Sequence, residues 1–94
     1  MNNWDNNNTK SLAKAILTLD SPQEVKNFLR DLLTEEELLE IGKRWQAARM
    51  LHNKIPYQTI QKETGLSSTT VARISKWLQT GTGGYLDAIK KMEK

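Results

Sequence analysis

The segment that most limits how this chain can fold is residues 57–78, YQTIQKETGLSSTTVARISKWL. Apolar residues recur at helical spacing on both sides of one glycine, namely Ile60, Leu66, Val71, Ile74 and Leu78. The glycine, Gly65, stands where a first helix must end, and a left-handed backbone conformation costs little there only for glycine. The segment therefore predicts two short helices joined by a tight turn.

The second of these helices would present a surface suited to DNA. Ser67 and Ser68 can cap its start, because a serine hydroxyl accepts a hydrogen bond from a free backbone amide. The side chains expected to face outward are Ser68, Thr69, Ala72, Arg73 and Lys76. They are small, hydroxyl-bearing or cationic, and a surface without acids suits phosphates and base edges. The segment predicts a helix-turn-helix whose second helix enters a major groove.

A pair of helices with a glycine turn is also common in proteins that bind no DNA. The alternative interpretation is a helical module that binds another protein through the same scaffold. The distribution of charge favours DNA, because the chain has a net charge of +3 and residues 54–80 contain four bases and one acid. A basic cluster of this kind is the expected electrostatic signature of a nucleic-acid surface.

Composition excludes several other classes of function. The 94 residues contain no cysteine, so disulfides and thiolate metal sites are excluded. No apolar run is long enough to span a bilayer. His52 is the only histidine, and it has no evident partners for a catalytic triad or a metal site. We expect a cytoplasmic protein that is not an enzyme, binds no cofactor or metal and makes no contact with a membrane.

The rest of the chain also predicts helices. Residues 1–8 are rich in asparagine and predict a disordered tail, followed by one helical domain over residues 9–94. Outside the segment described above, helices are expected over residues 9–19, 22–33, 35–52 and 85–94. Thr34 and Glu37 can form a capping box at the start of the third helix. The prediction is an all-α fold of about six helices.

The expected helix over residues 35–52 is apolar on more than one side. Its inner stripe consists of Leu38, Ile41, Trp45, Ala48 and Leu51. Leu39 and Met50 lie off that stripe. Because so small a chain offers few partners for a second apolar face, the pattern indicates that another subunit covers it. Residues 80–84, TGTGG, read as a hinge before the last helix.

Four pieces of the chain resemble a known family. They are LLTEEELLEIGKRW at 32–45, ARMLHNKIPY at 48–57, TGLSSTTVARISKWL at 64–78 and GTGGY at 81–85. Together they resemble the Trp repressor-like family, and within it the YerC/YecD-type branch. The resemblance implies an intertwined homodimer with two DNA-reading heads, which binds a two-fold-symmetric operator and regulates transcription as a repressor.

The resemblance and the charge pattern together give a set of candidate DNA-binding residues. They are Gln58, Gln61, Lys62, Ser67, Ser68, Thr69, Thr70, Ala72, Arg73 and Lys76. The first three lie on the first helix of the predicted helix-turn-helix, and the others lie at the turn or on the second helix. Lysine and arginine would contact phosphates and supply most of the affinity.

The resemblance also implies a pocket for a small effector. The matching residues are Thr34, Arg44, Thr70, Arg73, Ile74 and Trp77. Arg44 and Arg73 match the two arginines that sandwich tryptophan in the Trp repressor. Ile74 and Trp77 stand where that family has a glycine and a serine, and their bulk predicts that tryptophan is excluded. A repressor gated by tryptophan or by another small effector remains the alternative.

Overall fold

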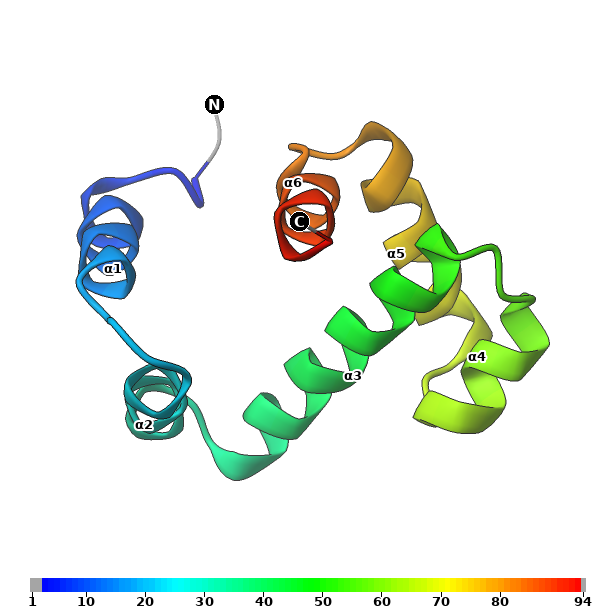
Figure 1. Cartoon of the computed structure of the whole chain (residues 1–94), viewed down its shortest axis with the longest axis horizontal. Coiled ribbons are helices and arrows are strands. Elements are labelled where there is room, and N and C mark those ends of the chain that lie inside the picture. Colours follow the sequence, from blue (N-terminus) through cyan, green and yellow to red (C-terminus); the bar gives the residue numbers. More distant parts are fainter. Residues whose placement is uncertain (1–2, 94) are drawn as a thin grey trace. The chain divides into compact units, whose positions relative to one another are not determined.

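A computed structural model describes residues 3–93, and Figure 1 shows the helices they form. The elements are α1 (Asn7–Leu17), α2 (Pro22–Leu32), α3 (Glu35–His52), α4 (Tyr57–Thr64), α5 (Ser68–Thr80) and α6 (Gly84–Met92). These six helices, with no strand in residues 3–93, confirm the predicted all-α fold. The chain divides into two compact units, the first ending at Leu38 and the second beginning at Leu39.

In the first unit, α1 begins two residues earlier than the sequence pattern predicts. The Asn6 side chain accepts a hydrogen bond from the Thr9 amide at 3.0 Å, and the Thr9 hydroxyl accepts one from the Asn6 amide at 2.9 Å. This capping box satisfies amides that a helix start otherwise leaves free. Asn7 and Asn8, assigned to a disordered tail from the sequence, therefore belong to the helix. The first two residues of that predicted tail lie outside the described residues.

The first unit has no buried core of its own. Ser21 caps α2 as expected, and its hydroxyl accepts a hydrogen bond from the Glu24 amide at 3.1 Å. No residue of α1 or α2 is buried. Leu17 is 84% exposed and Leu32 is 50% exposed. Leu17 and Leu32 thus leave apolar surface of these two helices exposed.

The start of α3 has the predicted capping box. The Glu37 amide donates to the Thr34 hydroxyl at 3.1 Å, and the Thr34 amide donates to the Glu37 carboxylate at 2.9 Å. The backbone hydrogen bond from Thr34, and then the bond to its side chain, lower the pKa of Glu37 from its usual value of 4.5. Glu35 and Glu36 share this first turn, where negative charge is favoured by the helix dipole.

The second unit contains the hydrophobic core. The fully or nearly fully buried apolar residues are Ala47, Ala48, Ile60, Leu66, Val71, Ile74 and Ile89. Helix α5 packs against both α4 and α6 (Figure 1). The rings of Trp45 on α3 and Tyr85 on α6 are stacked, with centroids 6.5 Å apart. This unit therefore provides a rigid support for the α4–α5 hairpin.

The inner stripe of α3 agrees with the prediction in part, because Ala48 is buried and Trp45 and Leu51 pack against the core. Ala47 and Ala48 are fully buried, whereas Ile41 is 38% exposed. Met50, expected off the stripe, packs against the core, and Leu39 is 60% exposed. The small alanines allow close approach of the rest of the second unit, and Ala47, which the predicted stripe did not include, shares the central position with Ala48. The exposed isoleucine and leucine lie nearer the N-terminal end of α3.

Candidate DNA-binding interface

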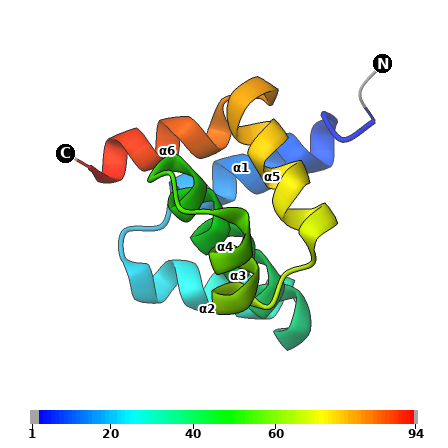
Figure 2. The same cartoon turned by 90° about the vertical axis from the view of Figure 1, so that its right-hand side faces the viewer.

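Figure 2 shows the bend between α4 and α5. A glycine and a threonine form this bend. Gly65 has φ of +77° and donates its amide to the Gln61 carbonyl at 2.8 Å. The Thr64 hydroxyl donates to the Ile60 carbonyl at 2.7 Å and accepts from the Leu66 amide at 3.2 Å. Sequence reasoning identified the glycine and Leu66 but missed Thr64, which is buried and connects the end of α4 to the turn. These bonds define the angle at which α5 begins.

The start of α5 is capped as the sequence indicates. The Ser67 hydroxyl accepts a hydrogen bond from the Thr70 amide at 3.1 Å and donates one to the Thr70 hydroxyl at 3.0 Å. The two hydroxyls are thus hydrogen-bonded to each other, and Ser67 also caps the helix. Both residues belong to the candidate DNA-binding set. Ser68 and Thr69, the first two residues of the helix, are exposed.

Helix α5 has two opposite faces. Its inner face consists of Val71, Ile74, Ser75 and Leu78, which are buried or half-buried. Its outer face, consisting of Thr69, Ala72, Arg73 and Lys76, is exposed along its whole length. Each set has the spacing i, i+3, i+4, i+7 that puts residues on one side of an α-helix. The helix therefore presents a continuous surface of two cations, one hydroxyl and one methyl group.

Three of the candidate DNA-binding residues belong to α4. Gln58 and Lys62 are exposed, and Gln61 is half-buried. Their spacing of three and four residues is compatible with one side of the helix. None of the ten candidate DNA-binding side chains is buried in a single chain.

Within the described part of the chain, no ion pair neutralises the positive charges of this hairpin. In residues 3–93 the ion pairs join Arg30 to Glu35, Arg44 to Glu40 and His52 to Glu93. None of these pairs includes a residue of α4 or α5. The cations of the two helices are consequently available to an anionic partner such as the phosphate backbone of DNA.

The connection into α4 carries a further cation. Lys54 has φ of +65°, a left-handed conformation that is uncommon for a residue other than glycine. Its amide donates to the Leu51 carbonyl at 3.0 Å, which ends α3 in a tight turn. The side chain is exposed, so a fourth positive charge stands at the edge of the hairpin.

The predicted effector residues have different surroundings. Thr34 belongs to the first unit, where its hydroxyl completes the capping box of α3. In the second unit, Arg44 pairs with Glu40 at 3.4 Å, Ile74 is fully buried in the core, and Trp77 is 45% exposed. Trp77 lines a shallow hollow of about 470 Å³ at the junction of α5 and α6, together with Tyr85 and glycine backbone.

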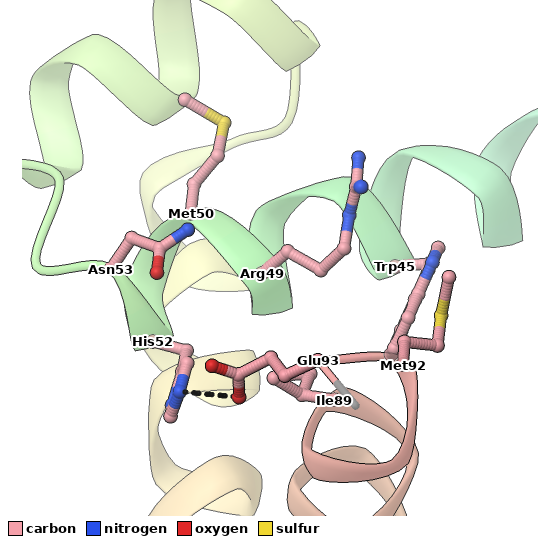
Figure 3. Close-up of a pocket in the computed structure, with 8 residues that line it drawn as sticks. All are labelled: Trp45, Arg49, Met50, His52, Asn53, Ile89, Met92 and Glu93. Atoms are coloured by element: carbon pink, nitrogen blue, oxygen red, sulfur yellow. Dashed lines mark ion pairs between the residues drawn. The ribbon is translucent and has the colours of Figure 1, made fainter.

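A second hollow, of about 400 Å³, lies between α3 and α6 (Figure 3). Its lining consists of Trp45, Arg49, Met50, His52, Asn53, Ile89, Met92 and Glu93. The His52 Nε2 atom lies 3.4 Å from the Glu93 carboxylate, across one edge of the hollow. The sequence showed no evident partner for His52, so this pair was not anticipated. None of the six predicted effector residues lines this hollow.

Two absences concern residues 3–93 alone. No group of three histidine or acidic side chains is close enough to hold a metal ion. Among the helices of this part of the chain, none combines the length and apolar character needed to cross a membrane.

Comparison with known proteins identifies the fold's relatives. A model of the family described as Trp repressor protein matches residues 7–93. The chain belongs to the Trp repressor family. This confirms the resemblance seen in the sequence, and the match extends over more of the chain than the pieces that suggested it. Members of the Trp repressor family are DNA-binding regulators, which agrees with the exposed, cationic face of α5.

Individual relatives lead to the same family. YerC, an uncharacterized protein of Bacillus subtilis, is 35% identical over 85 residues, which cover 87% of this chain and 82% of YerC. A TrpR-like protein from Eubacterium eligens has a structure with a TM-score of 0.91 and 29% identity, covering 99% of this chain and 96% of that one. A candidate Trp repressor from Staphylococcus aureus has a structure with a TM-score of 0.87 and 33% identity, covering 94% of this chain and 88% of that one.

Proposed function

We propose that this member of the Trp repressor family is a sequence-specific DNA-binding regulator of transcription, not an enzyme, and that it acts as a homodimer. Each copy would lay α5 in a major groove, and the two copies would read two halves of a symmetric operator. A dimer bound across a promoter would repress the gene by blocking access to it. The observation that carries the proposal is the outer face of α5, which is exposed, free of acids and opposite the core.

The proposed dimer rests on the exposed apolar surface of the chain. Leu17, Leu32 and Leu39 are each at least half exposed, and α1 and α2 bury no residue. A chain of about this size already has a thin core, and leaving further apolar area in water lowers its stability. A second copy that covers these leucines would supply the missing contacts, and closed two-fold dimers are the commonest protein assemblies.

The proposed affinity for DNA rests on charge. Lys54, Lys62, Arg73 and Lys76 are exposed, and none has an ion-pair partner in residues 3–93. Each lysine or arginine that neutralises a phosphate releases a counterion, so the logarithm of the binding constant falls with the logarithm of salt concentration. Loss of one such contact is expected to reduce the slope of that plot by about one.

The direct test is binding of the full chain to fragments of its own genome at two salt concentrations. We expect a shift in mobility that weakens as salt rises, and we expect Arg73→Ala to weaken binding by about 1–3 kcal/mol. Lys91→Ala, which removes one exposed positive charge from α6, is the matched control and should bind nearly as well as the parent. No salt-dependent binding to any fragment would contradict the proposal and favour a protein-interaction module.

A further inference from the structure

We propose that Arg73 and Ala72 are the residues that specify bases, and that each half of the operator contains a guanine and a thymine no more than about two base pairs apart. The inference depends on the proposed DNA-binding function and adds the sequence class to be bound. It follows from which side chains of α5 are both exposed and chemically uncommitted.

The capping bonds remove two candidates from base recognition. The Ser67 and Thr70 hydroxyls are joined at 3.0 Å, and Ser67 also accepts from the Thr70 amide. The Ser67 hydroxyl proton is already donated to Thr70, and Thr70 is itself half-buried, so neither side chain is well placed to read a base. The base-reading groups must therefore come from Ser68 or from the outer face that consists of Thr69, Ala72, Arg73 and Lys76. The hydroxyls of Ser68 and Thr69 can both donate and accept, so they discriminate little between bases. In a helix-turn-helix the N-terminal part of the second helix approaches the base edges.

Arg73 has the chemistry to read guanine. It is exposed, lies on the outer face of α5 and has no ion-pair partner in residues 3–93. Its planar guanidinium offers two parallel N–H donors, and guanine alone presents two neighbouring acceptors, O6 and N7, in the major groove. Lys76 lies one turn further along the helix and has a point charge, which suits a phosphate better than a base edge.

Ala72 has the chemistry to read thymine. Its exposed methyl group neither donates nor accepts a hydrogen bond, so it can favour only an apolar feature of the groove. Thymine supplies that feature through its C5-methyl group. Neighbouring Cα atoms are about 3.8 Å apart, close to the rise of about 3.4 Å between bases along a strand. The two base contacts should consequently fall at adjacent or nearly adjacent base pairs.

The experiment begins with selection of bound sequences from a pool of random duplexes, using the full chain. The selected guanine is then replaced by 7-deazaguanine, which lacks the N7 acceptor, and the selected thymine by uracil, which lacks the methyl group. We expect the first change to weaken binding about five- to tenfold and the second about three- to fourfold. The same two replacements outside the selected bases serve as controls and should have no effect.

Protein variants assign each effect to a side chain. Arg73→Lys keeps the charge but loses the planar pair of donors, so its salt slope should match the parent while 7-deazaguanine weakens its binding less than it weakens that of the parent. Lys76→Gln should do the opposite, reducing the salt slope by about one and leaving the 7-deazaguanine effect unchanged. Ala72→Gly should remove the uracil effect. Because glycine also weakens a helix, circular dichroism must first show that this variant is folded.

The outcomes separate the inference from the function on which it rests. Tight binding to selected sites that contain no neighbouring guanine and thymine would overturn the inference and leave DNA binding intact. The same conclusion follows if 7-deazaguanine and uracil have no effect on the parent protein. Failure to select any duplex, even at low salt, would instead contradict the proposed function itself.

Discussion

Gly65 shows how a single backbone conformation sets the geometry of the hairpin. Its φ of +77° lies in the left-handed region, and a Cβ built at this position would meet no atom within 4 Å. Any cost of a side chain here therefore comes from the backbone conformation and not from collision with neighbours. The adjacent Thr64 then holds the turn through its two hydroxyl bonds.

At this residue scale we predict that Gly65→Ala lowers the free energy of unfolding by about 1–2 kcal/mol. The matched control is Gly42→Ala in α3, where a Cβ also meets nothing within 4 Å but the backbone is helical. That variant should gain up to about 1 kcal/mol, because alanine is the better helix former. Urea denaturation at one fixed protein concentration measures both. Equal effects of the two substitutions would show that the turn at Gly65 is not strained by a side chain.

Helix α3 begins with a capping box in which a carboxylate, that of Glu37, accepts a hydrogen bond from the Thr34 amide. The hydrogen bonds from Thr34 lower the pKa of Glu37. A lowered pKa in the folded state means that the carboxylate stabilises the fold fully above its usual pKa of 4.5. This contribution is lost as the pH falls through the lowered value.

At the element scale we predict that the start of α3 loosens on acidification. Carbon-detected nuclear magnetic resonance of the Glu37 carboxyl should give a titration midpoint below 4.5. In Thr34→Ala the midpoint should rise towards that usual value, although not completely, because the backbone bond remains. Thr18→Ala, which removes an exposed hydroxyl near the end of α1, is the control and should leave the Glu37 midpoint unchanged. A Glu37 midpoint unaffected by Thr34→Ala would exclude the side-chain bond as a cause.

At the scale of the whole molecule, the two units differ in how many residues they bury. Among residues 3–93, every buried residue belongs to the second unit, and none lies in α1 or α2. Helices with an exposed apolar side are marginal in water unless another surface packs on them. The proposed dimer would provide that surface, which links the stability of the first unit to assembly.

At this scale we predict that the unfolding midpoint rises with protein concentration, because dissociation and unfolding are coupled in a dimer of this kind. Sedimentation should give about twice the chain mass of 10.8 kDa. Leu32→Glu should shift the mass towards that of one chain, whereas Asn27→Glu, an exposed polar site on the same helix, should not. A concentration-independent midpoint and a single-chain mass for the parent would rule out the dimer.

A second prediction for the whole molecule concerns its ligand. We predict that calorimetric titration with L-tryptophan gives no binding heat. Ile74 is part of the core and cannot retreat without opening a cavity there, and Trp77 adds bulk on the same helix. Trp77→Ser puts a small residue at position 77 but leaves Ile74 in place, so titration of this variant with L-tryptophan should also give no binding heat. A one-to-one heat for the parent protein would show that tryptophan is accommodated after all.

Local features of the chain were predictable because their causes are local. The turn at Gly65, the caps at Ser21, Thr34 and Ser67 and the outer face of α5 each depend on residues no more than a few positions apart. Helical periodicity likewise predicts which side chains share a face. The sequence alone therefore determined the number of helices, most of their ends and the composition of the candidate DNA-binding surface.

Only the tertiary structure decided what each face packs against. Periodicity on α3 placed Ala48 on the inner side, but it could not show that Ala47 would be buried while Ile41 stays exposed, since this depends on the approach of distant segments. The Trp45–Tyr85 stack and the His52–Glu93 pair also join residues about 40 positions apart. Burial and pairing of this kind are set by contacts between helices, whereas a sequence pattern determines only which residues share one side of a helix.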